Sequence, residues 1–354
     1  MLLDFNKLAL NEQAVISHIP KSYQGVVVSC SGGVDSVVLF HEMLAFTKSK
    51  INFSMHAVHV NYRLRGSDSD GDQAFVEALC HRYNVPCEVY VVTDDELAEC
   101  RDGKGIQAWA RAIRRRLFAE WSQRGYVIAL GHHLDDLAET IIFRLARGVA
   151  PENMAGMSLF SPPLWRPFLR IPKSEILNVA KTNGISFRED ASNAKMEYAR
   201  NVIRQKILPE LEALFPGALE RLTACAEETR DLAVFCRQQL SVDADFTAQD
   251  GIDVVKLLRL PRGAALIVLQ QAIHQYIGSG RQLTRKNMTS LLEMLSKVSQ
   301  TTDRQRLMDL RLGVYAEVQF GRLFFRHDQV YPGGFPINSA LKLQDHSKGV
   351  DVHG

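Results

Sequence analysis

The sequence predicts an α/β fold: a parallel sheet with helices on both faces, followed by a smaller, mostly helical domain. The first observation is a series of short apolar runs typical of buried strands, at residues 26–28, 53–60, 87–92 and 126–131. The second is that helical patterns such as "DQAFVEALCHRY" and "IQAWARAIRRRLFAEW" lie between these runs, and such alternation is typical of parallel sheets. The third is size, since 354 residues with 46% hydrophobic composition can bury the cores of two domains.

The chain divides into three predicted regions. We expect a first domain over residues 1–214, because a basic helix stopped by Pro209 precedes the break at "FPGALE". Residues 215–330 have the pattern of a smaller helical domain that ends in a hairpin near Gly321. Residues 331–354, which include "PGG" and "HSKG", are predicted to form a loosely ordered tail.

Composition limits the classes of function. Forty-two Lys and Arg against 40 Asp and Glu give a net charge of +2, so a nucleic-acid-binding surface has to be a local patch. The N-terminus has no signal-peptide core and no apolar run is long enough to span a bilayer, so we expect a soluble cytoplasmic protein without a membrane partner. The six cysteines form no CxxC pair or zinc-finger spacing, and Cys30 is interpreted as a small buried residue.

The stretch "SCSGGVDSVVLF", residues 29–40, predicts a phosphate-binding turn between a strand and a helix. Glycines let the backbone approach a ligand closely, and the N–H groups at a helix start favour phosphate oxygens. No lysine follows the glycines, which disfavours the GxxxxGK[ST] loop of kinases and GTPases. The alternative is a plain tight turn in which Asp35 or Ser36 caps the helix.

A second group of polar residues follows the strand that ends at Gly131. In "GHHLDDLAET" a helical spacing places His132, Asp135, Asp136 and Glu139 on roughly one face. Such a group suits Mg²⁺ that bridges nucleotide phosphates, and it equally suits a cationic substrate. The alternative is that Asp135 and Asp136 only complement the helix N-terminus. Because ligands lie beyond the carboxyl ends of parallel strands, we expect this group and the phosphate loop to build one site.

Two basic segments offer phosphate contacts. Arg111, Arg114 and Arg115 lie on one predicted helix, and Arg200 and Arg204 are one helical turn apart on another. A solvated charged face is the ordinary explanation of either segment. Two such segments beside one nucleotide site favour contacts with nucleic-acid phosphates, which position a nucleic acid without reading its sequence.

Taken in order, these motifs resemble those of a known enzyme family. "SGGVDS" is similar to the pyrophosphate loop of the ATP pyrophosphatase (PP-loop) superfamily. The order "SGGVDS", "HVNYRLRGSDSD", "GIQAWARAIRRR", "HHLDDLAET", "WRPFL", "REDASN" and "ARNVIR" resembles the tRNA(Ile)-lysidine synthetases over about residues 20–210. The resemblance implies a Rossmann-like fold of the adenine nucleotide alpha hydrolase type, with ATP and Mg²⁺ as cofactors.

The resemblance also implies a ligase reaction. ATP adenylates the C2 oxygen of the wobble cytidine, position 34, of the tRNA(Ile) with a CAU anticodon. The amino group of L-lysine then attacks C2 and expels AMP, which gives lysidine and changes codon reading from AUG to AUA. Binding tRNA, ATP and lysine together supplies much of the rate by proximity, and the target base has to leave the anticodon loop.

The resemblance assigns roles residue by residue. The ATP-binding residues it implies are Ser31, Gly32, Gly33, Val34, Asp35 and Ser36. The catalytic residues it implies are Asp35, His132, Asp135, Asp136, Glu139, Arg111 and Arg114, with Asp35 and Asp136 as contacts of Mg²⁺. The tRNA-binding residues it implies are Arg200, Asn201, Arg204 and Arg115, together with the region 215–330. Asn61 and Arg63 are further site candidates.

Two departures and two alternatives remain open at this point. Arg115 stands where the family has an aromatic residue, and the C-terminal part has room for one domain where longer members carry two. One alternative is another PP-loop tRNA-modifying enzyme of the thiolase type, which the lack of a CxxC pair disfavours. The other is a catalytically silent nucleotide- or RNA-binding homologue, which the intact acidic residues disfavour. The sequence leaves a homodimer open.

Overall fold

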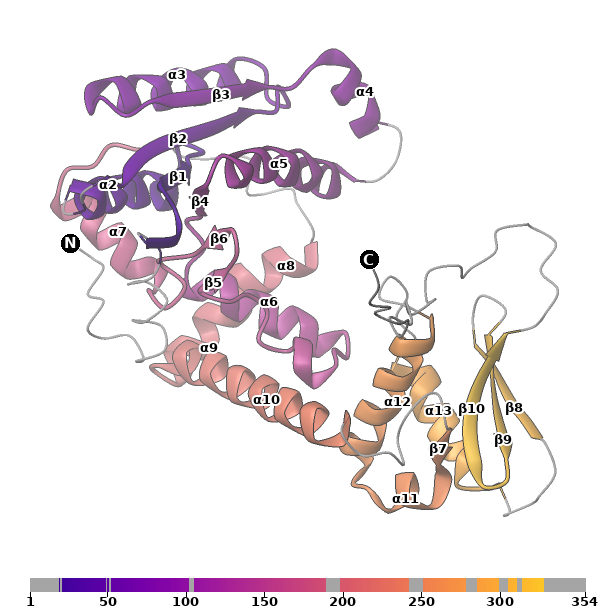
Figure 1. The fold of residues 1–354 in the computed structure, drawn as a ribbon. Helices are drawn as coiled ribbons and strands as arrows, with labels where there is room; N and C mark the ends of the chain where they lie inside the picture. Colours follow the sequence, from indigo (N-terminus) through magenta and orange to yellow (C-terminus); the bar gives the residue numbers. More distant parts are fainter. Residues whose placement is uncertain are drawn as a thin grey trace, which may run out of the picture. The chain divides into compact units, whose positions relative to one another are not determined.

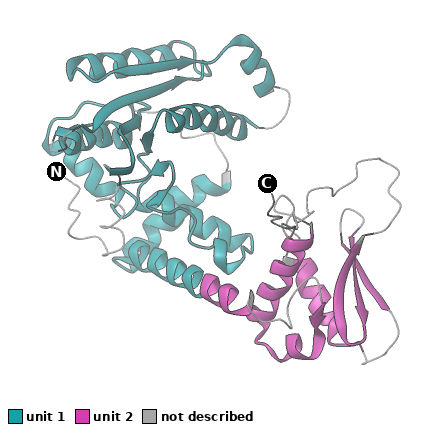
Figure 2. Cartoon of the chain, in the orientation of Figure 1, with its two compact units in different colours: residues 1–232 teal, residues 233–354 magenta. Residues whose placement is uncertain are grey.

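The computed structural model describes residues 19, 21–48, 50, 52–101, 105–188, 198–241, 251–277, 285–298, 305–310 and 314–327. The chain forms two compact units, Met1–Leu232 and Ala233–Gly354 (Figure 2). The division falls inside helix α10, Ala218–Ser241, and so lies later in the chain than the expected break after residue 214. The expected tail, residues 331–354, lies outside the described residues.

The first unit is built on a six-stranded sheet with the order β3-β2-β1-β4-β6-β5 (Figure 1). Every neighbouring pair is parallel except β5 and β6, so the predicted parallel sheet is confirmed. The strands are β1 Gly25–Ser29, β2 Ser54–Asn61, β3 Cys87–Val91, β4 Tyr126–Ala129, β5 Phe160–Ser161 and β6 Leu164–Trp165.

Helices cover both faces of this sheet because alternate side chains of each strand point to opposite faces. Val26 and Val28 of β1 share a core with residues of α2, α3 and α7, whereas Val27 packs with Phe118 and Trp121 of α5. The helices are α2 Val34–Lys48, α3 Ser67–Arg82, α4 Asp94–Arg101, α5 Ile106–Gln123, α6 Leu134–Ala146, α7 Lys173–Thr182, α8 Tyr198–Val202, α9 Leu208–Leu214 and α10.

Pro209 does not stop the basic helix, contrary to the prediction. A π-helical stretch, Ile203–Ile207, joins α8 to α9, and Pro209 lies in the first turn of α9. Proline is tolerated there because the first N–H groups of a helix need no intrahelical partner. The segment that carries Arg204 is therefore held between two helices.

The strand order places one crevice at the centre of the sheet. The chain proceeds from β1 outward to β2 and β3 and then returns to β4 on the other side of β1. Ligands of open α/β sheets bind at such a reversal, beyond the carboxyl ends of the strands. The two segments that leave β1 and β4 are in contact there, since a Cβ built on Gly131 would lie 3.2 Å from the carbonyl carbon and oxygen of Asp35.

The second unit packs helices against an antiparallel sheet with the order β7-β10-β9-β8. The predicted hairpin is formed by β9 and β10, and its turn residues Phe320 and Gly321 both have positive φ, as hairpin turns of type I′ require. The elements are β7 Ile252–Asp253, α11 Val254–Arg259, α12 Arg262–Ile277, α13 Arg285–Leu295, β8 Gln305–Leu310, β9 Val314–Gln319 and β10 Arg322–His327.

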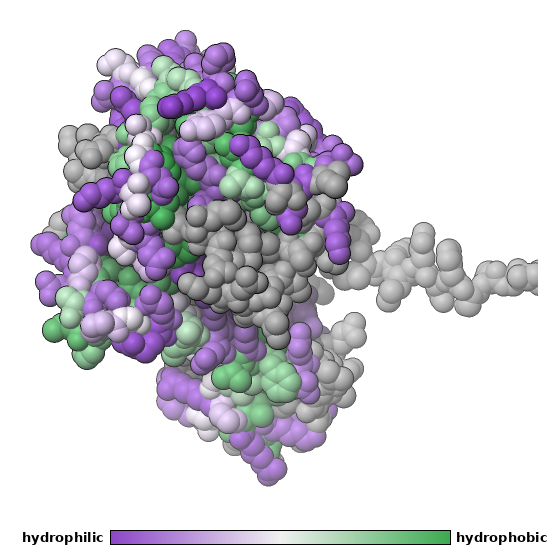
Figure 3. All heavy atoms as spheres, turned by 90° about the vertical axis from the view of Figure 1, so that its left-hand side faces the viewer, coloured by the Kyte–Doolittle hydropathy of each residue, from purple (hydrophilic) through white to green (hydrophobic). Residues whose placement is uncertain are grey.

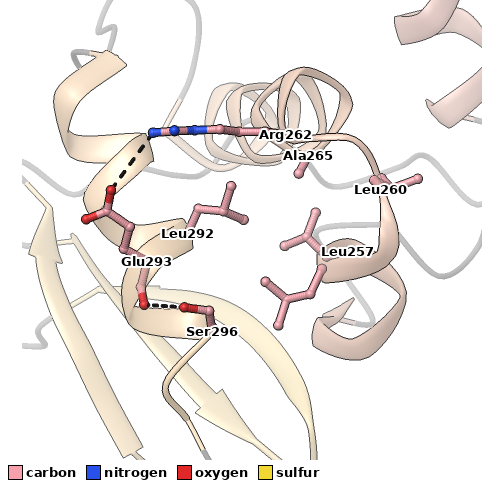
Figure 4. A pocket seen from close by; sticks show the side chains of 8 residues that line it. Leu257, Leu260, Arg262, Ala265, Leu292, Glu293 and Ser296 are labelled. Atoms are coloured by element: carbon pink, nitrogen blue, oxygen red, sulfur yellow. Dashed lines mark hydrogen bonds and ion pairs between the residues drawn. The ribbon is translucent and has the colours of Figure 1, made fainter.

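A pocket of about 280 Å³ lies in the second unit (Figure 4). Leu257, Leu260, Leu292 and other apolar side chains line it, and Arg262 and Glu293 form an ion pair of 3.9 Å beside them. A lining of this kind offers little chemistry. The candidate catalytic residues therefore all come from the first unit.

Hydrophilic residues cover much of the described surface on the face drawn in Figure 3. Across the described ranges, no helix combines the length and the apolar character that crossing a membrane requires.

Candidate active site

The segment after β1 folds as a tight loop organised by the hydroxyl of Ser36. This hydroxyl donates a hydrogen bond to the carbonyl of Gly33 at 2.9 Å and accepts one from the backbone N–H of Ser31 at 3.1 Å. Gly32 has φ +92°, a conformation that L side chains rarely adopt, so this position requires glycine. Val34 begins α2, so the start of that helix faces the loop. The arrangement is the strand, turn and helix that favour phosphate binding.

Residues from two other motifs hold the loop from the side. The backbone N–H of Arg188 donates to the carbonyl of Gly32 at 2.9 Å, and its Nε lies 2.9 Å from Oδ1 of Asp72. Asp72 also pairs with Arg65 at 2.6 Å. The "HVNYRLRGSDSD" segment and Arg188 thus support the glycine turn, while the rest of "REDASN" lies outside the described residues.

Asn61 and Arg63, the weaker site candidates, make local contacts. The Asn61 side chain donates to Asp70 at 3.1 Å and to Gln73 at 2.9 Å, and Arg63 pairs with the exposed Asp94 at 2.6 Å. Asn61 thus bonds to α3, the helix that follows β2, whereas Arg63 bonds to the segment that follows β3, since it also donates to the carbonyl of Val92 at 3.4 Å. These contacts tie the turn after β2 to α3 and to the start of α4.

Cys30 lies at the start of the loop and is buried in the core. Burial raises the pKa of its thiol to about 11, and hydrogen bonds to the loop only partly offset this effect. A thiol with so high a pKa is a poor nucleophile at neutral pH. The structure therefore agrees with the interpretation of Cys30 as a packing residue.

His133 is the centre of the acidic group. Its Nδ1 lies 3.4 Å from Oδ2 of Asp135, and its Nε2 lies 3.3 Å from Oδ2 of Asp136. The same Nε2 is 3.9 Å from Oδ2 of Asp35, which belongs to the phosphate loop. One buried imidazole thus joins the segments that follow β1 and β4, as the predicted single site requires.

The pKa values of this group reflect mutual stabilisation. Burial would lower the pKa of His133, but the neighbouring carboxylates of Asp135, Asp136 and Asp35 more than offset it, so this pKa is raised. Burial would likewise raise the pKa of Asp135, but His133 and the backbone N–H of Lys173 lower it. The cluster therefore favours a protonated imidazole beside ionised carboxylates.

His132, the histidine chosen from the sequence, has different surroundings. Burial lowers its pKa to about 4, and although Asp136 acts in the opposite direction, Arg166 and Arg114 act with the burial. Helix α6 begins at Leu134 with His133 at its N-cap, so His132 precedes the helix and does not share its face. The helical spacing failed here because it included His132 in the helix, two positions before the observed start at Leu134.

Lys173 is a site residue that sequence reasoning missed. At the start of α7, its backbone N–H donates to Oδ2 of Asp135 at 2.8 Å, and its Nζ pairs with Oδ1 of Asp35. Asp35 and Lys173 are 138 positions apart, and no local pattern links them. Lysine followed by Ser and Glu is typical of an ordinary helix start. The role of Lys173 therefore could not be predicted without knowing the fold.

Arg204 neutralises the far end of the acidic group. Its Nε lies 2.8 Å from Oε2 of the buried Glu139, and one terminal nitrogen lies 2.7 Å from Oδ1 of Asp136. Arg200 lies 3.9 Å from the other oxygen of Glu139. Burial would lower the pKa of Arg204, but the charges of Asp136 and Glu139 raise it. Arg200 and Arg204, which the sequence predicts to bind RNA, thus contact the acidic residues that it predicts to bind lysine or Mg²⁺.

The arginines of α5 lie apart from these ion pairs. Arg111 and Arg115 are exposed, and Arg114 is half-buried near His132. The buried Nε of Arg114 has no hydrogen-bond partner in the part of the chain that the structure describes. Asn201 is half-buried in α8 beside Arg200.

The chain was compared with known protein families. Residues 6–211, which contain the loop, the acidic group and both basic segments, match the family described as PP-loop domain. The chain belongs to this PP-loop family. The glycine turn after β1 is therefore its PP loop.

Curated relatives with one name match about two thirds of the chain. The tRNA(Ile)-lysidine synthase of Bacillus subtilis (strain 168) is 33% identical over 260 residues, 69% of this chain and 54% of that protein. The tRNA(Ile)-lysidine synthase of Pseudomonas aeruginosa is 31% identical over 243 residues, 67% of this chain and 53% of that protein. The chain thus spans about half the length of the curated relatives it matches.

A solved structure shares the fold. The U34-tRNA thiolase of Methanococcus maripaludis, solved with its [4Fe-4S] cluster, aligns with a TM-score of 0.50 and 22% sequence identity. The alignment covers 62% of this chain and 79% of that one. At this identity the likeness concerns the PP-loop fold alone.

The PP-loop site presents the glycine turn and the start of α2 at one end and the carboxylates around His133 at the other. Among the described residues, no three His, Cys, Asp or Glu side chains are arranged to hold a metal ion by themselves. A magnesium ion on nucleotide phosphates needs only one or two carboxylates. Asp35 fits this requirement, because it borders the PP loop and its side chain is 31% exposed.

Proposed function

We propose that this PP-loop protein ligates L-lysine to C2 of cytidine 34 in the tRNA(Ile) with a CAU anticodon, with conversion of ATP to AMP and pyrophosphate. The observation that carries the proposal is the junction of two sites at Asp35: the phosphate-binding loop on one side and a buried acidic group on the other. The names of the curated relatives support the same reaction. A homodimer is not part of this proposal.

The PP loop acts on the leaving pyrophosphate. Ser31, Ser36 and the backbone from Gly32 to Val34 surround the place where the phosphates bind, at the positive end of α2. Pre-organised donors stabilise charge as it develops on the leaving group, commonly by about 2.7 to 4 kcal/mol per donor. The loop thereby favours attack of the C2 oxygen on the α-phosphate, which forms the adenylated cytidine.

Asp35 and Asp136 are the residues that would hold a magnesium ion. When bound, such an ion neutralises part of the negative charge of the triphosphate. Lys173 already pairs with Asp35 and Arg204 with Asp136, so these side chains also position the two carboxylates.

The acidic group acts on the incoming lysine. Asp135, Asp136 and Glu139 provide negative charge for its ammonium group, and their present partners are the protein's own cations. A protonated amine cannot attack, so a carboxylate of this group accepts a proton from the ammonium group before the C–N bond forms. Attack at C2 breaks the bond to the adenylate oxygen and expels AMP, which leaves lysidine.

The basic segments hold the other substrates. Arg111 and Arg114 lie on α5, on which Arg114 is close to His132, and they would steady the adenylated intermediate. Arg115, Arg200, Asn201 and Arg204 would hold the tRNA. Planar guanidinium groups bind phosphates in a bidentate way, which orients the strand as well as attracting it.

The test is incorporation of radiolabelled lysine into tRNA by the purified chain with ATP and Mg²⁺. The CAU-anticodon isoleucine tRNA and the CAU-anticodon methionine tRNA are compared, because they share the anticodon. We expect label in the isoleucine tRNA and at least about tenfold less in the methionine tRNA. Splitting of ATP to AMP without labelled RNA would contradict the proposal and indicate another acceptor.

A further inference from the structure

The last turn of α6 and its C-cap carry three side chains that the proposed function does not use: Phe143, Arg144 and Arg147. The ring of Phe143 contacts two guanidinium groups, with Cζ of Arg200 4.8 Å and Cζ of Arg147 5.3 Å from its centroid. Arg144 donates to the carbonyl of Asn153 at 2.5 Å. Side chains of α6 and α8 thus form one surface of aromatic and guanidinium planes.

This surface concentrates positive charge. No described carboxylate pairs with Arg111, Arg144 or Arg147 in the structure. The pKa of Arg144 is lowered, first by burial and then by the charges of Arg200 and Arg111. Like charges held close together cost free energy, and a bound anion removes that cost.

The helix dipole explains only part of this arrangement. Basic residues in the last turn of a helix are favourable, which is sufficient for Arg144 and Arg147 taken one at a time. It gives no reason for Arg200 of α8 and Arg111 of α5 to lie near the same helix end. Arg147 and Arg200 on one aromatic ring, with Arg144 and Arg111 close enough for their charges to interact, indicate a site for a ligand with several negative charges.

The surface is continuous with the candidate active site. Arg200 contacts Phe143 and also lies 3.9 Å from Glu139, one turn earlier on α6. From Asp136 to Arg144 the helix axis advances about 12 Å. A strand whose target base lay at Glu139 would therefore carry its next phosphates along α6 towards Arg144 and Arg147.

We infer that Phe143, Arg144, Arg147 and Arg200 bind the RNA strand that flanks the target base. The guanidinium groups contact successive phosphates, and the ring of Phe143 offers a stacking surface to an unpaired base. The phosphates of a single free nucleotide are few and lie close together. They cannot contact all of the arginines that are spread along α6. The inference rests on the proposed function, which takes tRNA as the substrate.

The experiment measures the affinity of the full chain for the CAU-anticodon isoleucine tRNA over a range of salt concentrations. For the double variant Arg144→Gln with Arg147→Gln, we expect weaker binding and a plot of log Kd against log salt that is shallower by about 0.7 to 0.9 for each lost phosphate contact. Phe143→Leu should weaken binding several-fold without changing the slope, since it removes stacking and no charge.

Arg124→Gln is the matched control. Arg124 also stacks on an aromatic ring, 4.7 Å from the Trp121 centroid, but it pairs with Glu88 on another part of the unit. It should leave both affinity and slope unchanged. The variant Arg144→Lys, which keeps the charge, should keep the slope and so distinguishes lost charge from lost folding.

The possible results separate the two proposals. A double variant with the slope of the unsubstituted chain would overturn this inference and leave the proposed function standing. Equal loss of slope in the Arg124→Gln control would also overturn it, because the effect would then be one of net charge. Absence of tRNA binding by the unsubstituted chain would overturn both.

Discussion

At the scale of single residues, two adjacent histidines have opposite surroundings. His133 lies within 4 Å of three carboxylates, at 3.4, 3.3 and 3.9 Å. At His132 burial dominates, and the charges of Arg166 and Arg114 add to its effect against that of Asp136. The difference arises because α6 begins at Leu134, so that His133 is its N-cap and contacts Asp136 in the first turn. His132 lies one position further from the helix. The position at which the helix starts thus decides which imidazole belongs to the acidic group.

The raised pKa of His133 predicts a pH dependence. The folded state binds this proton more tightly than the unfolded chain, so the stabilisation is fully present below the ordinary value of 6.5. It is lost as pH rises through the raised pKa. We expect His133→Gln to lower the free energy of unfolding more at about pH 6 than at about pH 9, as measured by urea unfolding.

His132 provides the matched comparison, because its pKa is lowered to about 4. The unfolded chain takes up a proton on this residue between pH 6.5 and 4, so His132 reduces stability as pH falls through that range. His132→Gln should remove this loss, and its effect should therefore have the opposite sign to that of His133→Gln. Variants that both lose stability at low pH would contradict the assignment.

At the scale of elements, the site depends on the close approach of β4 and α2. Gly131, two residues after the end of β4, would place a Cβ 3.2 Å from the backbone of Asp35. We expect Gly131→Ala to reduce stability by about 1 to 3 kcal/mol, because backbone atoms cannot yield as a flexible side chain can. The loop that carries Asp35 would shift with them and weaken ATP binding, measured by equilibrium titration.

Gly263→Ala is the control for this prediction. Gly263 lies in α12, and a Cβ built there meets no atom within 4 Å. Alanine should stabilise the helix by up to about 1 kcal/mol and leave ATP binding unchanged. A Gly131→Ala variant with unchanged stability and ATP affinity would show that the two segments can separate freely.

The sequence predicted the elements better than the contacts between them. Buried valines of β1 and the glycine turn after it are local patterns, so the sheet and the PP loop could be read directly. The pairing of Lys173 with Asp35, or of Arg204 with Glu139, spans 138 or 65 positions and follows only from the fold. Strands β5 and β6 have two residues each, too few for a periodic pattern.

Apolar periodicity also misled at one element. The helical spacing of Leu219, Leu222, Leu232 and Phe235 in the sequence predicts one apolar stripe along α10. Leu219 is buried, but Leu232 and Phe235 are 66% and 58% exposed. Periodicity shows which residues share a helix face, not how far along the helix a partner extends. The exposed part of the stripe begins where the first unit ends.

At the scale of the whole molecule, the chain has two separate groups of cores. The clusters of the first unit contain residues of the parallel sheet and of helices up to α10, and the buried cluster of the second unit contains residues from β7 to β10. All the candidate site residues belong to the first unit, within the range that matches the PP-loop family. Stability and ligand binding should therefore be separable between the units.

This separation predicts two transitions in calorimetric unfolding of the full chain. A non-hydrolysable ATP analogue with Mg²⁺ at about 100 times its Kd should stabilise the first unit by about 2.7 kcal/mol and move only one transition. The variant Leu291→Ala leaves a cavity in the buried core of the second unit. It should lower the free energy of unfolding of that unit by about 2 to 5 kcal/mol, and so lower the temperature of the other transition only. A single transition that responds to both changes would mean that the units unfold together, because ligand binding in one would then stabilise the other.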